Sequence, residues 1–316
     1  MPVLKSAGIL GAGFGLYGHL PAAVTAGAEN VVLLNRYRNV FADRSELNRF
    51  KDCVRWVETE DDLLAVCDTL VLARAPSANF RLLPACLRHP NIQRFMIEKP
   101  PGPTPSAARA FFDQLASTSC RVSLPFRHLG WAKSALRFLR LEENAAGELN
   151  IEWSFIAHHF RGPKDTWKKR HIDGGGPLRF YGIHLIALLA EAGFETAESS
   201  SVTRTNCGSF VRWEAHFVRP GRASARVSVD SNIEKEIFSV TALDSQAIEV
   251  TSIFESKSPF GMIGNGAERG RNSQDFRVAS LGEVYKSFRE EDLGFMELNA
   301  GLVRLWESVE HITSFD

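Results

Sequence analysis

The segment AGILGAGFGLYGH, residues 7–19, joins a short apolar run to a turn rich in glycine. Gly11 permits a tight turn after a buried strand, and Gly13 lets the backbone come close to a pyrophosphate group. The third glycine of the GxGxxG pattern falls at position 16, which is Leu16, although Gly15 stands beside it. Because a helix after such a turn offers free N–H groups to an anion, the segment predicts a dinucleotide site. The alternative is a structural turn without a ligand.

Short apolar runs alternate with helix-compatible segments through the first 125 residues. The runs are almost continuously apolar, which is typical of strands covered on both faces in a parallel sheet. This alternation predicts an α/β fold, a doubly wound βαβ series with right-handed crossovers. The expected strands are Ala7–Leu10, Val31–Leu34, Val54–Val57, Thr69–Ala73, Phe95–Ile97 and Val122–Leu124, and the expected helices include Ser45–Lys51, Ala78–Arg88 and Pro105–Ala116.

The pattern changes after Pro125. A helix is expected over Trp131–Arg140, and beyond it apolar side chains alternate with polar ones, which is the period of a strand with one solvated face. This alternation predicts an α+β domain with a large open, mostly antiparallel sheet. The segments that carry it are Leu149–Phe155, Phe210–Val218, Ala223–Val229 and Ile237–Leu243, with a further apolar run at Ile248–Phe254.

Two domains are therefore expected, a dinucleotide-binding domain over 1–123 and a substrate-binding and oligomerisation domain over 124–316. Domains of about 100–200 residues are common, so the length agrees with this division. In the second domain, Gly174-Gly175-Gly176-Pro177 is expected to open a helix, because proline is well tolerated at the first helical position. A mobile loop is expected over Ser256–Asn272 and a closing helix over Gly294–Ile312.

The composition argues against several classes of protein. Lysine and arginine together number 37, as do aspartate and glutamate, so no overall positive charge is available to hold a nucleic acid. No apolar run approaches the roughly 20 residues of a membrane span, and the N-terminus lacks the pattern of a signal peptide. The five cysteines are widely spaced without a CxxC pair, which favours a reducing compartment. We therefore expect a cytoplasmic protein without nucleic-acid or membrane partners.

The end of the second expected strand indicates which dinucleotide is bound. An acidic residue there would accept the ribose 2′-hydroxyl of NAD, whereas arginine would bind the 2′-phosphate of NADP. The strand ends at Asn35-Arg36-Tyr37-Arg38, without a carboxylate. Asn35 can hydrogen-bond a sugar oxygen, Arg36 offers a planar fork to a phosphate, and Arg36 or Arg38 can stack on adenine. NADP(H) is thus favoured over NAD(H); the alternative is two surface arginines on a loop.

Three further motifs accompany the glycine turn. The fourth expected strand ends in Ala73-Arg74-Ala75-Pro76-Ser77, the fifth delivers Glu98-Lys99-Pro100, and Gly174-Gly175-Gly176 is followed eight residues later by His184. Together these motifs resemble those of the glucose–fructose oxidoreductase and inositol dehydrogenase family (Gfo/Idh/MocA). The resemblance covers nearly the whole chain and implies a Rossmann domain joined to an open-faced sheet domain. It also implies NAD(P)(H)-dependent interconversion of an alcohol and a carbonyl on a sugar-like or nucleotide-sugar molecule.

Lys99 is the first catalytic candidate. It is expected at the carboxyl end of a strand, where open α/β sheets bind ligands, and Pro100 restricts its backbone to an extended conformation. The resemblance assigns it a place beside the nicotinamide, where an ammonium stabilises the oxyanion that develops during hydride transfer. The alternative is a surface lysine paired with Glu98. The expected cofactor contacts are Gly11, Gly13, Phe14, Gly15, Asn35, Arg36, Arg38, Ala75, Pro76 and Glu98.

His184 and Tyr181 are the other catalytic candidates. A histidine titrates near neutral pH and can take or give the hydroxyl proton, and Tyr181 lies three residues earlier on the same helix face. Without the glycine hinge and the family spacing, a lone histidine on an apolar helix would be interpreted as a core residue. The family's usual Asp, four residues before this histidine, is Phe180 here, and the Asp often found three residues after it is Ala187. This departure leaves a non-catalytic NADP(H)-binding regulator or partner subunit as the alternative function.

Several polar residues are expected to bind the substrate together with Tyr181. Arg127 stands where family members often carry an arginine near the ligand, and Trp167-Lys168 matches a Trp-basic pair seen before the triple glycine. The basic run 168–171 would attract an anionic small molecule, or else forms a solvated loop. The adjacent His158 and His159 face opposite sides of a strand and do not make a metal site, so no metal is expected.

The resemblance also points to homodimers or homotetramers that associate through the open sheet face. A large exposed apolar patch commonly binds a partner. The aromatic residues expected to enrich that face are Trp153, Phe155, Phe210, Trp213 and Phe217.

Overall fold

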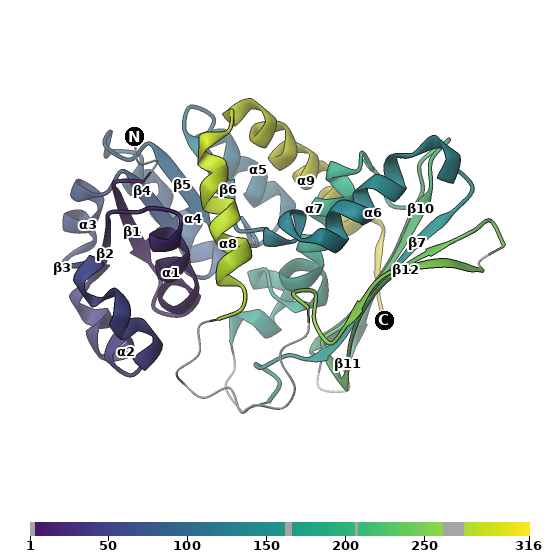
Figure 1. Ribbon diagram of the computed structural model, residues 1–316, viewed down its shortest axis with the longest axis horizontal. Helices are drawn as coiled ribbons and strands as arrows, with labels where there is room; N and C mark the ends of the chain where they lie inside the picture. The colour runs from purple at the N-terminus through teal and green to yellow at the C-terminus, as the bar shows by residue number, and fades with distance from the viewer. Residues whose placement is uncertain (1–3, 162–165, 206–207, 247, 262–274) are drawn as a thin grey trace. The chain divides into compact units, whose positions relative to one another are not determined.

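The structure is a computed structural model that describes residues 4–161, 166–205, 208–246, 248–261 and 275–316. These residues form two compact units, and each unit contains its own sheet (Figure 1). The first unit consists of the described parts of Met1–Pro101, Ala110–Pro125 and Gly264–Met296. The second consists of the described parts of Gly102–Arg109, Phe126–Ile263 and Glu297–Asp316.

The first unit contains a six-stranded parallel sheet in the order β3-β2-β1-β4-β5-β6. The strand order reverses between β1 and β4, and open α/β sheets bind their ligands at such a point. The doubly wound α/β fold expected from the sequence is thereby confirmed. The strands are β1 (Ser6–Leu10), β2 (Asn30–Leu34), β3 (Val54–Val57), β4 (Thr69–Leu72), β5 (Arg94–Ile97) and β6 (Ser119–Val122).

Strand β6 begins and ends earlier than the expected position, Val122–Leu124. The Ser123 N–H still donates to a β5 carbonyl (2.8 Å), whereas the Leu124 N–H turns back to its own strand (2.7 Å). Pro125 has no N–H with which to continue the ladder, so the apolar residues beyond the strand belong to a turn.

Both faces of this sheet are covered, as the almost continuous apolarity of its strands predicts. The side chains of β2 from Val31 to Leu34 and those of β4 are all buried. Helix α4 begins two residues before its expected start, because Pro76 fits the first helical position without an N–H. The helical segments are η1 (Gly15–His19), α1 (Leu20–Thr25), η2 (Asn35–Tyr37), α2 (Arg38–Ala42), η3 (Ser45–Cys53), α3 (Glu60–Val66), α4 (Pro76–Cys86) and, from Ala110 onward, α5 (Pro105–Gln114).

A late segment of the chain returns to the first unit. Helix α8 (Val278–Lys286), followed by the turn η9 (Ser287–Arg289), packs against α1, and the two helices lie side by side in Figure 1. Leu281, Val284 and Tyr285 are buried in the core of this unit. This helix was not among those expected from the sequence.

The second unit contains a seven-stranded mixed sheet in the order β12-β11-β7-β10-β9-β8-β13. The β7–β10 and β8–β13 pairs are parallel and the other four pairs are antiparallel, so the expected mostly antiparallel sheet is confirmed. The strands are β7 (Glu148–Ile156), β8 (Ser199–Arg204), β9 (Phe210–Phe217), β10 (Ser224–Asp230), β11 (Asn232–Leu243), β12 (Glu249–Ser256) and β13 (Thr313–Phe315).

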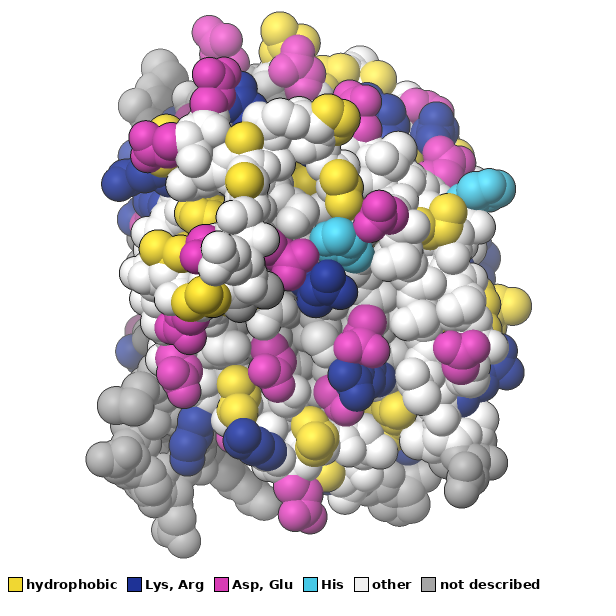
Figure 2. Space-filling model, turned by 90° about the vertical axis from the view of Figure 1, so that its right-hand side faces the viewer, with side chains coloured by type: hydrophobic (Ala, Val, Ile, Leu, Met, Phe, Trp, Pro, Cys, Tyr) yellow, Lys and Arg dark blue, Asp and Glu magenta, His cyan; other side chains and the backbone are white. Residues whose placement is uncertain are grey.

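Three of the five aromatic residues expected on the open face of this sheet lie in its core instead. Trp153, Trp213 and Phe217 are buried in the core, at 8%, 0% and 0% exposure. Strand side chains alternate between faces, so the large apolar residues share the covered face and leave polar ones such as Glu152 and Ser228 on the other. Figure 2 views the molecule from the side that lies on the right in Figure 1 and shows acidic, basic and histidine side chains together with scattered hydrophobic ones.

The second unit also supplies the helix expected after the triple glycine, which begins at Pro177 as a π-helical turn and continues as α7. The closing helix α9 begins two residues earlier than expected, and most of the loop predicted at 256–272 lies outside the described residues.

In the described part of the chain, no helix is long and apolar enough to cross a membrane. The helical segments are η4 (Pro125–His128), α6 (Gly130–Arg140), η5 (Glu142–Asn144), η6 (Trp167–Lys169), η7 (His171–Asp173), η8 (Pro177–Gly182), α7 (Ile183–Glu191) and, from Glu297 onward, α9 (Asp292–Ile312).

Candidate functional site

The carboxyl ends of the parallel strands bring together residues that are far apart in the sequence. Gly11 follows β1, Asn35 follows β2, Glu58 follows β3, Arg74 lies just beyond β4 and Glu98 follows β5. Because parallel strands all end at the same edge, these residues lie along one edge of the first sheet.

The glycine turn after β1 contains one crowded and one open position. Gly11 has φ +154°, and a Cβ there would clash with the Ala73 carbonyl oxygen. A Cβ at Gly13 would meet no heavy atom of the described residues within 4 Å, so this part of the turn borders open space. Backbone at an open glycine can come close to a ligand such as a pyrophosphate.

Leu16, at the place of the third glycine, is fully buried, and its N–H donates to the Gly13 carbonyl (3.0 Å). The third glycine of the pattern allows close packing, and here two glycines on either side of Leu16 provide it. A Cβ at Gly15 would lie 3.0 Å from the Ile9 side chain, and one at Gly18 would clash with the neighbouring Phe14 ring. The chain therefore departs from the GxGxxG pattern because Gly15 and Gly18 flank the place of the third glycine, and the turn after β1 is still formed.

Phe14 packs edge-on against Tyr17 and His19, with ring centroids 5.4 Å apart in both pairs. The Arg277 guanidinium, at the start of α8, lies 4.2 Å from the Phe14 ring centroid and donates two hydrogen bonds to Asp275 (2.8 and 2.7 Å). Phe14 was predicted from the sequence and Arg277 was not, because residue 277 reaches this turn only through the return of α8 to the first unit.

The end of β2 meets a carboxylate that comes from the end of β3. The Asn35 side-chain amide donates to Glu58 and accepts a hydrogen bond from Arg38 Nε (2.7 Å). The Arg38 guanidinium also lies 4.7 Å from the ring centroid of Trp56, a β3 residue. The acidic side chain that the sequence lacks after β2 is thus supplied by the neighbouring strand.

Two arginines near the same edge share one carboxylate. Arg36 Nη2 and Arg74 Nη2 each lie 2.5 Å from Glu60 Oε1, and Arg74 Nη1 lies 3.2 Å from Oε2. The hydrogen bond from Arg74, followed by that from Arg36, holds the pKa of Glu60 below its usual value. Glu60 is therefore ionised at neutral pH. Arg36 was predicted from the sequence as a cofactor contact. Glu60 and Arg74 were not, because they follow other strands.

Ala75 and Pro76 are both predicted cofactor contacts: Ala75 ends the loop after β4, and Pro76 is the first residue of α4. Asn79 fixes this loop from within: its side chain accepts a hydrogen bond from the Arg74 N–H (3.2 Å) and donates to the Leu72 carbonyl (3.2 Å). Asn79 is only 1% exposed, so these hydrogen bonds are shielded from water.

Glu98 and Lys99 follow β5, and the Lys99–Pro100 peptide is cis. His19 links Glu98 to α8: its Nε2 lies 3.3 Å from Glu98 Oε1, and its Nδ1 lies 2.8 Å from the Tyr285 hydroxyl. Burial alone would raise the pKa of Glu98, but the hydrogen bond from His19 and the charges of His19 and Lys99 bring it below its usual value. Burial raises the pKa of Tyr285, so its hydroxyl stays protonated.

In the second unit, the triple glycine packs directly against the Trp-Lys pair. Gly174 and Gly176 have φ of +88° and +83°, in the left-handed region that favours glycine. A Cβ at Gly175 would lie 2.5 Å from the Lys168 carbonyl oxygen and would also clash with that of Trp167. This packing explains why glycine is required at three successive positions.

Tyr181 and His184 are both buried among aromatic rings. The His184 ring stacks on Phe126 with centroids 4.4 Å apart and an interplanar angle of 17°. The Tyr181 ring lies edge-on to Phe155 and Trp153, at centroid distances of 4.7 and 5.6 Å. Tyr181 comes from the π-helical turn and His184 from the first turn of α7.

Phe180, which stands where the family resembled by the sequence carries Asp, is enclosed by the residues expected to bind the substrate. Its ring lies 5.3 Å from that of Trp167 and 4.8 Å from that of Tyr181, and Lys168 Nζ lies 5.1 Å from its centroid. The structure therefore gathers Trp167, Lys168 and Tyr181 around an apolar ring.

Two other candidate residues have acidic or basic partners. Arg127 Nε lies 3.4 Å from a carboxylate oxygen of Glu191, the last residue of α7. Asp173, just before the triple glycine, accepts a hydrogen bond from Arg170 Nε (2.5 Å). The role of Arg127 in substrate binding remains a prediction.

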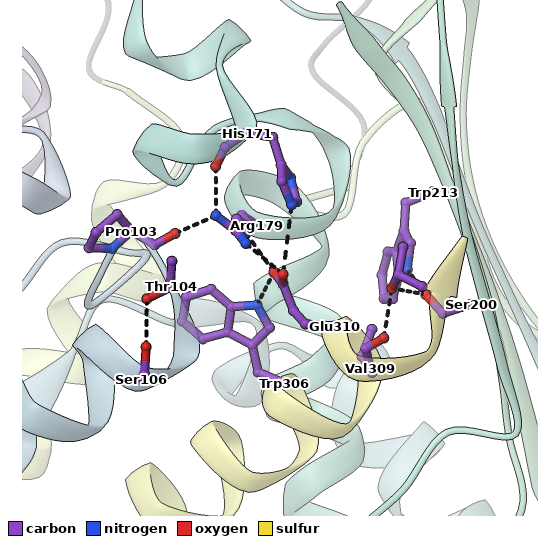
Figure 3. Close-up of polar contacts among 11 residues, drawn as sticks. Pro103, Thr104, Ser106, His171, Arg179, Ser200, Trp213, Trp306, Val309 and Glu310 are labelled. Atoms are coloured by element: carbon purple, nitrogen blue, oxygen red, sulfur yellow. Dashed lines mark hydrogen bonds and ion pairs between the residues drawn. The ribbon is translucent and has the colours of Figure 1, made fainter. Parts of the chain in front are cut away.

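A largely buried ion pair, which no sequence motif indicated, holds the π-helical turn that carries Phe180 and Tyr181 (Figure 3). Arg179 donates two hydrogen bonds to Glu310 (both 2.6 Å) and one each to the carbonyls of Pro103 and His171 (both 2.8 Å). Trp306 Nε1 donates to the same carboxylate (2.9 Å). Burial alone would raise the pKa of Glu310, but the hydrogen bonds from Arg179 and His171 lower it to about 2.

The donor set of the first unit suits a dinucleotide. The open backbone at Gly13 can approach a pyrophosphate, and the guanidinium groups of Arg36 and Arg74 converge on an anion. Among the described residues, no group of three or more His, Cys, Asp or Glu side chains could hold a metal ion.

Neither a family model nor a curated protein sequence matches the chain. Solved structures match over nearly its whole length. The WlbA (WbpB) dehydrogenase of Thermus thermophilus, in complex with NAD and UDP-GlcNAcA, is 14% identical, with a TM-score of 0.65 and coverage of 99% of this chain and 96% of that one. The 3-ketoreductase KijD10 of Actinomadura kijaniata, with NADP and TDP-benzene, is 13% identical, with a TM-score of 0.70 and coverage of 98% of both chains.

The aldose-aldose oxidoreductase of Caulobacter crescentus, complexed with glycerol, is also similar: 14% identity, a TM-score of 0.67 and coverage of 98% of this chain and 97% of that one. At these identities the likeness establishes the fold. These three structural neighbours are a dehydrogenase, a ketoreductase and an oxidoreductase.

Proposed function

We propose that the chain is an NAD(P)(H)-dependent oxidoreductase of the Gfo/Idh/MocA family that interconverts an alcohol and a carbonyl on a sugar-like or nucleotide-sugar molecule. One observation carries this proposal: the glycine turn, the Arg36–Arg74 pair and Lys99 follow different strands of one parallel sheet and share its carboxyl edge. The neighbours solved with NAD and UDP-GlcNAcA, and with NADP and TDP-benzene, support it.

In the proposed reaction, a bound nicotinamide supplies or accepts the hydride. The Lys99 ammonium stabilises the negative charge that develops on the substrate oxygen. His184 takes or gives the hydroxyl proton, with the Tyr181 hydroxyl as a further hydrogen-bonding group. The ionised carboxylate of Glu98 stabilises the charged form of Lys99.

The Lys99→Ala variant tests this mechanism. We expect kcat to fall by about 10²-fold or more, because a charged contact to the oxyanion is lost. Calorimetry should show that the variant still binds its nucleotide, which separates chemistry from binding. Lys286→Ala, a change in an exposed lysine of α8 that pairs with Glu283, is the matched control. Turnover of Lys99→Ala at the wild-type rate would contradict the mechanism.

A second candidate function is a non-catalytic NADP(H)-binding regulator or partner subunit. It is favoured by Phe180, whose ring occupies the family's carboxylate position and is packed against Trp167 and Tyr181. This function predicts nucleotide binding without turnover across polyols, sugars and nucleotide sugars. A sustained, substrate-dependent absorbance change at the nicotinamide band would exclude it.

We also propose an anionic substrate and self-association. The position of Lys168 against Phe180 supports attraction of a negative group, such as a carboxylate or a nucleotide diphosphate. Association through the open sheet face would rest on polar contacts, since that face carries pairs such as His216–Glu148 (3.0 Å). Light scattering after gel filtration measures the assembly state, and a monomer at all concentrations would contradict self-association.

A further inference from the structure

The Arg36–Glu60–Arg74 cluster has the chemistry of an anion site that is filled by the protein's own carboxylate. Two guanidinium groups from the ends of β2 and β4 converge on one oxygen of Glu60, at 2.5 Å each. Arginine's planar fork suits phosphate as well as carboxylate, and a phosphate offers more oxygens and more negative charge.

Two of the three residues have their backbone positions fixed by contacts outside the cluster. Glu60 is the first residue of α3, whose start is set by a capping box between Thr59 and Asp62. Arg74 is held at its backbone by the buried Asn79. The backbones of Glu60 and Arg74 therefore stay at this edge of the sheet without help from the ion pairs of the cluster.

The cluster is accessible to a ligand from solvent. The side chains of Arg36, Glu60 and Arg74 are 57%, 28% and 23% exposed. Ion pairs with this much solvent contact contribute little to stability, so replacing Glu60 by another anion costs the fold little.

We propose that Arg36 and Arg74 bind the 2′-phosphate of NADP(H) in exchange for the carboxylate of Glu60, which makes Glu60 the residue that limits the preference for NADP(H). This inference rests on the proposed function, because it requires a dinucleotide at the edge of the first sheet. The sequence points to Arg36 alone; Arg74 and Glu60 enter through the sheet order. Beside them, the Asn35–Glu58 pair can accept a hydrogen bond from a ribose hydroxyl. NAD(H), which carries that hydroxyl, therefore competes with NADP(H) for the site.

Calorimetric dissociation constants for NADPH and NADH, measured on the full chain, test the exchange. Arg74→Gln should weaken NADPH binding by about tenfold or more, since a charged hydrogen bond to the phosphate is lost, and should change NADH binding less than about twofold. Glu60→Gln should change the NADPH affinity in the opposite direction: binding should strengthen by about threefold or more, because the competing negative charge is removed. The NADPH affinity should also fall more steeply with salt than that for NADH.

Arg94→Gln is the matched control. Arg94 has a similar exposure, 25%, and lies 4.0 Å from a carboxylate, that of Asp68, but it stands at the start of β5 and hence at the opposite edge of the sheet. It should leave both affinities unchanged, and thermal melts should show that each variant is folded. Arg36→Gln should repeat the Arg74→Gln result if one arginine variant melts early.

Equal losses for NADPH and NADH in Arg74→Gln, or weaker NADPH binding in Glu60→Gln, would overturn the exchange while leaving the proposed function intact. If wild-type protein binds neither nucleotide, the proposed function fails and this inference fails with it. The two failures are therefore distinguishable in one set of titrations.

Discussion

Two glycine turns lead into helices in this chain, one in each unit. Both continue through a short π-helical turn, Gly15–His19 in the first unit and Pro177–Gly182 in the second. In the first turn, a Cβ at Gly13 would meet only open space in the described structure. In the second, a Cβ at Gly175 would run into the backbone of Lys168.

This difference separates two uses of glycine. An open glycine leaves room for something outside the chain, whereas a crowded glycine lets two backbone segments of the chain pack closely. The second turn is also held by the largely buried Arg179–Glu310 pair. We therefore interpret the first turn as a binding element and the second as a rigid support for Tyr181 and His184.

The largest expected effect comes from Glu310, which anchors the second turn. Its pKa is about 2 in the folded protein against 4.5 ordinarily, so the stability it contributes is present above about pH 4.5 and is lost as the pH falls toward 2. Glu310→Gln should lower the free energy of unfolding by about 3 kcal/mol near neutral pH. Urea unfolding should show this difference shrinking by about 2 kcal/mol between about pH 6 and pH 3.

A difference between wild type and Glu310→Gln that is independent of pH would mean that the ion pair does not hold the second turn. The comparison of one variant with wild type at each pH is needed because other carboxylates titrate over the same range.

Gly175→Ala should have a smaller effect on stability. The added methyl lies 2.5 Å from the Lys168 carbonyl oxygen, so backbone must shift, at a cost of about 1–3 kcal/mol in the free energy of unfolding. Urea denaturation measures this loss. An unchanged midpoint would show that the second turn is as open as the first, and the contrast between the two turns would disappear.

Gly13→Ala should have the smallest effect on the fold and a selective effect on binding. Its methyl enters open space, so the free energy of unfolding should change by less than about 0.5 kcal/mol. Calorimetric affinity for both NADPH and NADH should fall by about tenfold, because the backbone no longer approaches the pyrophosphate. Full affinity in a stable variant would remove the first turn from the binding site.

Much of the architecture follows from local patterns. The continuously apolar runs identify the parallel sheet, the alternating runs identify the mixed sheet, and Pro177 marks the start of its helix. Alternation also shows that a strand has two different faces. It does not show which face is covered, and for this reason Trp153 and Trp213 were expected on the open face although they lie in the core.

The candidate site was predictable only in part. Gly11, Lys99 and His184 are candidates because each belongs to a local motif: the glycine turn, Glu98-Lys99-Pro100, and the triple glycine with a histidine eight residues later. Their roles stay predictions. Helix α8 was not predicted, and nothing within Val278–Lys286 indicates that this segment returns to the first unit.

The sequence by itself determined the strands, the turns and the residue types at the carboxyl edge of the first sheet, since these depend on side-chain period and backbone freedom over about ten residues. Only the tertiary structure decided the partners: Glu60 between Arg36 and Arg74, and Tyr285 behind His19. Those partners depend on which strands are neighbours and where a distant helix docks. The physical reason is that hydrogen bonds and charge pairs act over a few ångströms in space, whatever the separation along the chain.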